Sequence, residues 1–456
     1  MDYAKLLKEL EVFNKKYNPI VSFCDYQAQL KNNNVVDQSN FFYQRAIVVK
    51  DNFNFKGSNT TASSKILETY VSPYNATVIE KIRKAGGIIV AKSSLDELGM
   101  GGTNKSAYTG PVLNPFDSKR ISGGSSGGSA VLVASELVDF ALGSDTGDSV
   151  RKPASFCGVV GVKPTYGRIS RYGVIPYASS LDHVGYFTTN VTNAAKALEV
   201  MAGRDDLDMT SLDAPVDKYS ELLNSDISNL KIAILGNVVD SLNNSAINDS
   251  FNQLMSKLKT QAQAVDIIHV DQKLMRALLP VYYIIANCEA TANHSNLDGL
   301  RFGLQLSGDN TTEVMCNSRT AGFSSMIRKR FVIGSYSLFE ENQEKLLRKA
   351  QKVRRLISEE FTKIYQDYDV IIAPASDVAP LFDESIDNEL DDKHMISDNY
   401  LVFANFLGLP SMSVPLTKIN GLPVGVNITA KKLHEVEMFN VGLAVEECVN
   451  FKRWED

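Results

Sequence analysis

A lysine and two serines occur in settings that favour hydrolytic chemistry. Lys50 ends an apolar run, Ser125 lies inside a run of glycines and serines, and Ser149 follows a turn after another apolar run. A serine hydroxyl is a weak nucleophile until a neighbouring base takes its proton. A lysine amine can be that base when burial disfavours its ammonium form and lowers its pKa. These residues therefore predict a serine nucleophile activated by an amine.

The run 122–129 consists of four glycines and four serines and leads directly into the helical pattern 130–134. Glycines let a backbone approach a ligand closely, and a helix start presents unpaired N–H groups. A phosphate-binding loop is excluded because no lysine follows the last glycine. The pattern Gly-x-Ser-x-Gly is matched at Ser125 and at Ser126, but the polar segment 114–120 is not the buried strand that a nucleophile elbow requires. A ligand-binding loop and a flexible surface loop remain the alternatives.

The turn before Ser149 is suited to stabilising negative charge. Thr146, Gly147 and Asp148 directly precede this serine. Backbone N–H groups that converge on one point stabilise a tetrahedral oxyanion, and loss of one such donor lowers the rate ~10²–10³-fold. We therefore predict that these three amides form an oxyanion hole.

Composition limits the class of protein. The chain has 456 residues, of which 44% are hydrophobic and 22% charged, as in globular proteins. Its 47 basic and 53 acidic residues exclude a general polyanion-binding surface, so another chain would have to hold any nucleic acid. Five scattered cysteines without a CxxC pair indicate neither a disulfide framework nor a zinc site, and they favour a cytoplasmic location. No apolar stretch is long enough for a membrane helix.

The elements that position these residues are predicted from alternating patterns. Short β-branched runs predict strands at 46–49, 87–91, 138–142, 159–162, 231–235, 266–270, 369–373, 411–414 and 424–429. Helical patterns occur at 76–84, at 191–201 and over the long segment 335–368, which we expect as a surface helix laid across the sheet. The alternation predicts an α/β fold with one large sheet built from both halves of the chain.

We expect a single domain over residues 1–456. It would comprise a short N-terminal helical region 1–44, a core at about 45–205, a polar surface loop at about 203–229, and a C-terminal half 230–456 that completes the sheet. The loop does not divide two domains, because strand patterns resume after it.

With these residues described, the chain resembles the amidase signature family, whose hallmark is a Lys/cis-Ser/Ser triad. Lys50 and Ser125 are 75 residues apart, and Ser125 and Ser149 are 24 apart, in agreement with the family's pattern. The resemblance implies that Ser149 is the nucleophile, that Ser125 bridges after a cis peptide from Gly124, and that Lys50 receives the proton through Ser125. It also implies the amidase signature fold, a large mixed β-sheet covered by helices on both faces.

Within the family, the chain is most similar to the amidase components of the glutamyl-tRNA(Gln) and aspartyl-tRNA(Asn) amidotransferases. Segments 157–168, 179–185, 282–283 and 298–303 carry this similarity, which runs from about residue 45 to the C-terminus. It implies a glutaminase that supplies ammonia for converting Glu-tRNA(Gln) to Gln-tRNA(Gln), or Asp-tRNA(Asn) to Asn-tRNA(Asn). It further implies a heterotrimer with subunits B and C, with ATP, magnesium and the misacylated tRNA held by the partner subunit and no cofactor or metal in this chain.

A glutaminase pocket needs a cation for the substrate's α-carboxylate and an anion for its α-ammonium, because neither charge is buried unpaired without cost. The resemblance assigns Arg330, in preference to Arg328, to the carboxylate and Asp398 to the ammonium. It places Tyr282 in the wall of the same pocket. The sequence therefore predicts glutamine as the substrate through this resemblance.

Asp148 departs from the family, which usually has glycine before the nucleophile. We predict that its carboxylate points away from the oxyanion hole, toward Arg151 or Lys152. Three alternatives stay open: a stand-alone amide hydrolase with another acyl group, a catalytically silent scaffold, and a Ser/His/Asp hydrolase that uses His394 or His434.

Overall fold

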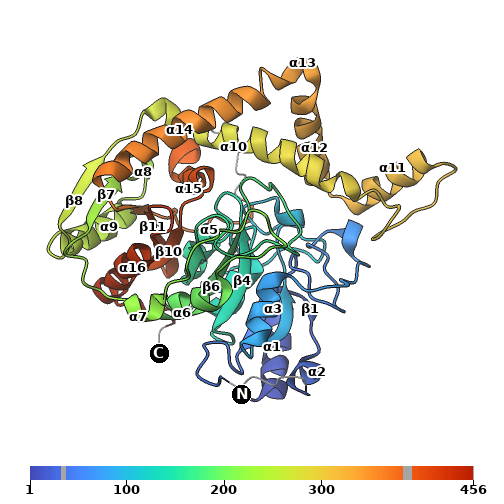
Figure 1. Ribbon diagram of the computed structural model, residues 1–456, viewed down its shortest axis with the longest axis horizontal. Helices are drawn as coiled ribbons and strands as arrows, with labels where there is room; N and C mark the ends of the chain where they lie inside the picture. The colour runs from blue at the N-terminus through green and yellow to red at the C-terminus, as the bar shows by residue number, and fades with distance from the viewer. Residues whose placement is uncertain (32–36, 384–392, 455–456) are drawn as a thin grey trace.

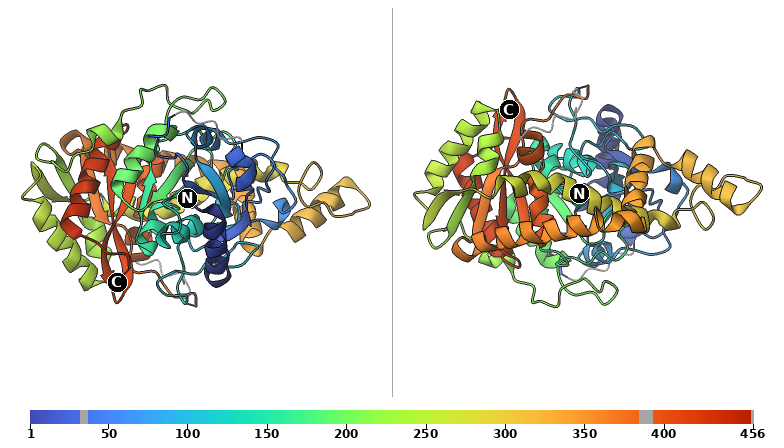
Figure 2. Two further views of the ribbon diagram at one scale, coloured as in Figure 1. Left: turned by 90° about the horizontal axis from the view of Figure 1, so that it is seen from below. Right: turned by 90° about the horizontal axis from the view of Figure 1, so that it is seen from above.

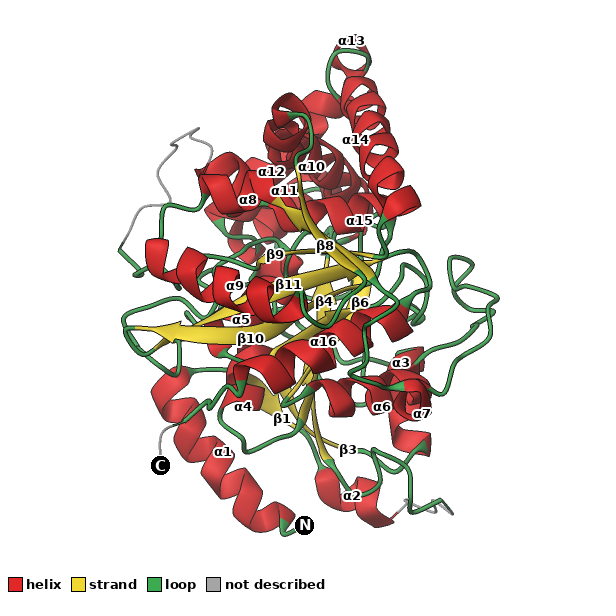
Figure 3. Cartoon of the chain, turned by 90° about the vertical axis from the view of Figure 1, so that its left-hand side faces the viewer, coloured by secondary structure: helices red, strands yellow, loops and turns green. Residues whose placement is uncertain are grey.

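A mixed β-sheet runs through the molecule from one end to the other (Figures 1 and 3). The computed structural model describes residues 1–31, 37–383 and 393–454. Within these residues the sheet has eleven strands in the order β1-β3-β2-β4-β6-β5-β10-β11-β9-β7-β8. The strands are β1 (Ile20–Phe23), β2 (Ala46–Lys50), β3 (Ile88–Ser93), β4 (Phe140–Asp145), β5 (Val160–Lys163), β6 (His183–Thr188), β7 (Lys231–Leu235), β8 (Ala264–Ile268), β9 (Val370–Pro374), β10 (Ser411–Ile419) and β11 (Leu422–Ala430).

The strand directions place the chemistry-bearing residues at one edge of the sheet. β2 lies between β3 and β4 and is parallel to both. Parallel neighbours bring their carboxyl ends to the same edge. Lys50 ends β2, and Asp145 ends β4. The lysine and the turn that leads to Ser149 therefore start from adjacent strand ends.

Successive side chains of β2 point to opposite faces of the sheet, and this alternation determines the face to which Lys50 points. Ile47 and Val49 belong to a core cluster on one face, whereas Ala46 and Val48 pack with the helices on the other face. Lys50 follows Val48 by two residues and so points to this second face. The helices there are α1 (Tyr3–Tyr17), α4 (Gly127–Ala134) and α5 (Arg151–Cys157).

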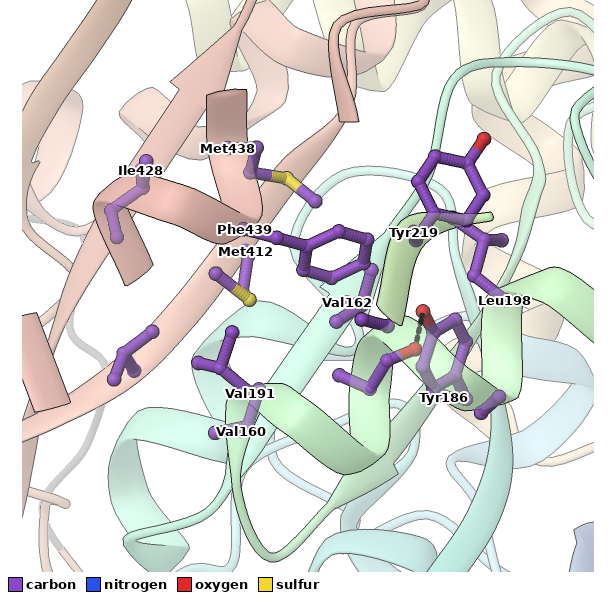
Figure 4. Close-up of a cluster of buried hydrophobic side chains, with 14 of the residues drawn as sticks. Val160, Val162, Tyr186, Val191, Leu198, Tyr219, Met412, Ile428, Met438 and Phe439 are labelled. Atoms are coloured by element: carbon purple, nitrogen blue, oxygen red, sulfur yellow. Dashed lines mark hydrogen bonds between the residues drawn. The ribbon is translucent and has the colours of Figure 1, made fainter. Parts of the chain in front are cut away.

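The first face carries the larger core cluster, part of which Figure 4 shows. Phe439 inserts between the sheet and Tyr219, and the ring centroids of Phe439 and Tyr219 are 5.8 Å apart. The Tyr186 hydroxyl donates a 2.8 Å hydrogen bond to the main-chain oxygen of Ala194. The helices that supply this cluster are α3 (Thr77–Lys84), α6 (Val191–Met201), α7 (Tyr219–Leu222), α9 (Ser245–Leu258) and α16 (Glu435–Val449).

The second face is covered over β7 and β9 by a different set of helices (Figure 1). They are α8 (Gly236–Ser241), α10 (Gln272–Asn293), α14 (Leu347–Asp367) and α15 (Phe403–Leu407). α11 (Thr311–Gly322) projects from the body (Figures 1 and 2), whereas α12 (Ser325–Leu338) packs against α10. The expected mixed sheet with helices on both faces is confirmed. Within the described residues no helix combines the length and the apolar character needed to cross a bilayer.

Two expectations about the elements were wrong. The segment 335–368 is not one surface helix, because α12 ends at Leu338, α13 (Glu340–Gln343) follows, and α14 begins only at Leu347. The extended backbone of Phe339, with ψ of 140°, breaks the helix and lets α12 and α14 both pack against α10. The region 1–44 is not only helical. Besides α1 and α2 (Tyr26–Lys31) it contains β1, which pairs antiparallel with β3.

Candidate active site

The amine of Lys50 lies at the centre of a cluster of serine hydroxyls. Its Nζ is 2.8 Å from Ser125 Oγ, 2.7 Å from Ser126 Oγ and 2.9 Å from Ser144 Oγ. Complete burial lowers the pKa of Lys50 to about 7, against the opposing effect of the carboxylates of Asp96, Asp145 and Asp182. Both forms of the amine are therefore populated near neutral pH, and the uncharged form can accept a proton from a serine.

The glycine-rich run positions Ser125 at the start of α4. The peptide bond between Gly124 and Ser125 is cis. A Cβ at Gly124 would lie 2.0 Å from Asp96 Oδ2 and 2.8 Å from the backbone nitrogen of Thr103, so only glycine fits. The Ser126 N–H donates a 3.1 Å hydrogen bond to the main-chain oxygen of Ser149. This bond joins the run to the turn that carries the predicted nucleophile.

A buried network holds the nucleophile turn in place. Arg151 Nη2 lies 2.9 Å from Asp145 Oδ1, and the same nitrogen donates to the oxygen of Gly147 at 2.7 Å. Asn405, from α15, accepts a 2.7 Å hydrogen bond from this guanidinium and donates to Asp145 Oδ1 at 3.0 Å. These supporting roles were not predicted. The only available signal was an acid and a base six residues apart around Ser149.

The amides predicted to form an oxyanion hole are free to receive a ligand. Within the part of the chain that the structure describes, the N–H groups of Thr146, Gly147 and Asp148 donate no hydrogen bond. Tyr282, from α10, packs so closely on Gly147 that a Cβ there would lie 3.0 Å from its Cζ. The geometry suits an oxyanion, and the role of these amides stays a prediction.

One cavity of about 460 Å³ brings the predicted substrate-binding residues together. Arg330, Asp398 and Tyr282 line it with Gly147 and Asp148 of the nucleophile turn. Ser149 is 3% exposed and directly follows these two turn residues. Residues more than 100 positions apart in the sequence therefore share one site. A second cavity, of about 240 Å³, includes Thr146 and Asp182, so the turn lines both cavities.

Arg330 lies among tyrosine side chains at the cavity. Its Nη1 lies 3.0 Å from the Tyr177 hydroxyl, and its guanidinium carbon is 5.1 Å from the centre of the Tyr283 ring. Among the described residues it forms no ion pair. Arg328 lies on the exposed side of the same helix and does not line the cavity. Arg330 thus lines the cavity and Arg328 does not, and the binding of a substrate carboxylate by Arg330 stays a prediction.

The Asp148 carboxylate turns toward Lys152, as predicted. The distance from Lys152 Nζ to Asp148 Oδ2 is 2.6 Å. Arg151, the other predicted partner, is instead occupied by Asp145. Asp148 therefore leaves the amides of its own turn unobstructed.

The two histidines of the Ser/His/Asp alternative lie in different places. His434 pairs with Glu437 at 2.8 Å at the start of α16, outside the cavity. His394 lines the cavity. In the Ser/His/Asp alternative, only His394 thus remains as a candidate base. Lys50, the base of the favoured interpretation, already contacts Ser125. No group of three or more His, Cys, Asp or Glu residues in the described ranges is arranged to hold a metal ion.

The chain is similar to known proteins over most of its length, both in sequence and in structure. The family model described as Amidase matches residues 4–439. The A subunit of glutamyl-tRNA(Gln) amidotransferase from Natranaerobius thermophilus is 40% identical over 405 residues, which cover 88% of this chain and 81% of that protein. The corresponding protein from Thermotoga maritima is 37% identical over 421 residues, with 92% and 87% coverage. A crystal structure of the Thermotoga maritima protein has a TM-score of 0.80 at 33% identity and covers 97% of this chain and 90% of that chain.

Proposed function

The chain belongs to the amidase family, and from that premise we propose that it is the glutaminase subunit of a tRNA-dependent amidotransferase. The observation that carries the proposal is the charge arrangement of the larger cavity. Arg330 is a cation without an acidic partner in the described residues, and Asp398 lines the same cavity. A free amino acid carries one charge of each sign on its α-carbon and matches this pair. An apolar acyl group would offer the half-buried Arg330 guanidinium no compensating charge.

Glutamine hydrolysis proceeds in this proposal by two acyl-transfer steps. Ser149 Oγ attacks the side-chain amide carbon of glutamine, and its proton passes through Ser125 to Lys50. The resulting oxyanion is stabilised by the amides of the nucleophile turn. The carbon–nitrogen bond then breaks, the relayed proton goes to the leaving group, and ammonia departs. Water attacks the glutamyl ester and releases glutamate and the free serine.

The partner subunits complete the proposed activity. Ammonia would pass to a second protein chain that binds ATP, magnesium and the misacylated tRNA, and a third chain would hold the two together. The names of the relatives from Natranaerobius thermophilus and Thermotoga maritima support Glu-tRNA(Gln) as the acceptor. The formal charge of −6 agrees with the tRNA being held elsewhere in the complex.

The test measures ammonia release and tRNA amidation separately. The purified native complex is expected to release ammonia from glutamine and to form Gln-tRNA(Gln), while the complex with Ser149→Ala releases none above background. A native complex that hydrolyses simple amides but not glutamine would make the chain a stand-alone amide hydrolase. Equal background rates for native and Ser149→Ala proteins would make it a scaffold.

A further inference from the structure

Lys152 joins the nucleophile turn to the segment that carries Asp398. It lies in the first turn of α5, three residues after Ser149. Its ammonium is 2.6 Å from Asp148 Oδ2 and also donates to the main-chain oxygen of Asp398. The Lys152 and Asp148 side chains are only 13% and 19% exposed. One largely buried ammonium therefore contacts two segments that line the larger cavity.

The charge of this ammonium depends on its carboxylate neighbours. Burial alone lowers the pKa of Lys152, but the carboxylates of Asp148 and Asp398 hold it above its usual value. Removing one partner of a buried ion pair leaves the other charge without compensation. The N–H groups of the turn that contains Asp148, Thr146 to Asp148, donate no hydrogen bond within the described residues, so they are open to a carboxylate released from Lys152. These are the amides that an oxyanion would need.

We propose that Lys152 is a positioning residue that acts in two directions. It holds the Asp148 carboxylate away from the oxyanion-binding amides, and it holds the Asp398 segment at a fixed distance from Ser149. The second effect rests on the proposed function, in which Asp398 binds the α-ammonium of glutamine. Positions 148 and 152 therefore work as a unit: the acid keeps the lysine charged, and the lysine keeps the acid out of the site.

Two variants separate these effects. Lys152→Met frees the Asp148 carboxylate to compete for the amides, so kcat for glutamine is expected to fall about 100-fold. The loss of the bond to the Asp398 segment raises KM by about tenfold. In the double variant Asp148→Gly/Lys152→Met the competing carboxylate is gone, so kcat recovers at least about tenfold over Lys152→Met. KM stays raised, because Asp398 is still untethered.

The recovery of kcat without recovery of KM distinguishes positioning from a loss of stability. If Lys152 had a purely structural role, kcat of the double variant would be no higher than kcat of Lys152→Met, and that result would overturn the proposal. The proposal would also be overturned if Lys152→Met had the kcat and KM of the native protein. Lys431→Met is the matched control, because Lys431 forms a 2.8 Å ion pair with Asp369 outside both cavities. Its kcat and KM are expected to equal those of the native protein. If Lys152→Met does not fold, Lys152→Gln and Asp148→Asn/Lys152→Gln provide the same comparison.

A second substrate separates this proposal from the proposed function. p-Nitrophenyl acetate can acylate Ser149 without using Arg330 or Asp398, so its acylation rate reports the nucleophile, its proton relay and the oxyanion site without the amino-acid pocket. Lys152→Met is expected to slow this acylation, and the double variant to restore it. If glutamine is not hydrolysed by the native protein, the proposed function fails. The acylation rates then still decide whether Lys152 controls Asp148.

Discussion

The protonation state of Lys50 is the residue-scale property on which the proposed chemistry depends. The three serine hydroxyls around its Nζ, from Ser125, Ser126 and Ser144, offer hydrogen bonds but no negative charge. No carboxylate of the described residues pairs directly with Lys50, so desolvation dominates and the amine loses its proton near neutral pH. This explains how a lysine, ordinarily charged, can act as a base.

The pH dependence of glutamine hydrolysis follows from this shift. Because the neutral amine is the active form, kcat/KM is expected to rise as the pH increases through about 7, where Lys50 in the free enzyme loses its proton. A pH–rate profile measured with a constant ionic strength tests this. A flat profile between pH 6 and 8 would contradict the assignment of Lys50 as the base, and loss of activity in His394→Asn would favour the histidine instead.

Arg330 and Arg328 form a matched pair for testing the substrate pocket. Arg330→Met removes a cavity cation that forms no ion pair with the described residues, so KM for glutamine is expected to rise at least about tenfold, as for the loss of a charged hydrogen bond. Arg328→Met changes an exposed side chain on the same helix and should leave KM unaltered. Steady-state ammonia release with both variants provides the measurement. An equal KM for the two variants would contradict a role for Arg330 in binding glutamine.

At the scale of elements, the site depends on close approach between the run 122–129 and the loop after β3. Gly124 contacts Asp96 there, and the Asp96 carboxylate accepts N–H bonds from Thr103 and Asn104 at 3.1 and 2.8 Å. Because these donors are backbone N–H groups, the loop cannot move away from Gly124 without losing its hydrogen bonds to Asp96. The start of α4 is thus positioned by a loop that sequence analysis did not connect with it.

Gly124→Ala is expected to disrupt this contact. Its Cβ would lie 2.0 Å from Asp96 Oδ2, and relief of such overpacking typically costs about 1–3 kcal/mol of unfolding free energy. Gly102→Ala is the control, since nothing lies within 4 Å of its Cβ position. Thermal melting of the two variants compares them directly. Equal melting temperatures would show that the loop adapts freely.

At the scale of the whole molecule, one sheet ties both halves of the chain to the site. β5 from the N-terminal half pairs antiparallel with β10 from the C-terminal half. The helices α10 and α15 bring Tyr282 and Asn405 to a turn that begins at β4. The stability of the C-terminal half therefore determines whether the site is complete.

The core between α16 and the sheet should dominate this stability. Phe439→Ala empties a site that is 1% exposed and is expected to lower the free energy of unfolding by about 3–5 kcal/mol. Phe339→Ala, at a side chain that is 55% exposed, should change it by less than about 0.5 kcal/mol. Urea unfolding followed by circular dichroism measures both. A similar loss for the two variants would contradict the packing seen in Figure 4.

Much of the fold was predictable because its patterns are local. The run 46–49 alternates between two buried faces and became β2, and the pattern 191–201 became α6 with the same bounds. β6 was missed although its six residues are all buried. The break at Phe339 was also missed, because it depends on the packing of α12 and α14 against α10, which no local pattern records.

The sequence by itself singled out Lys50, Ser125 and Ser149 as the candidate triad, because their spacing and the family resemblance that it supports are properties of the chain. It also singled out Asp148 as unusual. Only the tertiary structure decided that Arg330, and not Arg328, lies in the cavity and that Lys152, and not Arg151, pairs with Asp148. The physical reason is that contacts between distant segments follow from strand order and helix packing. Residue types and spacing do not specify which strand ends become neighbours.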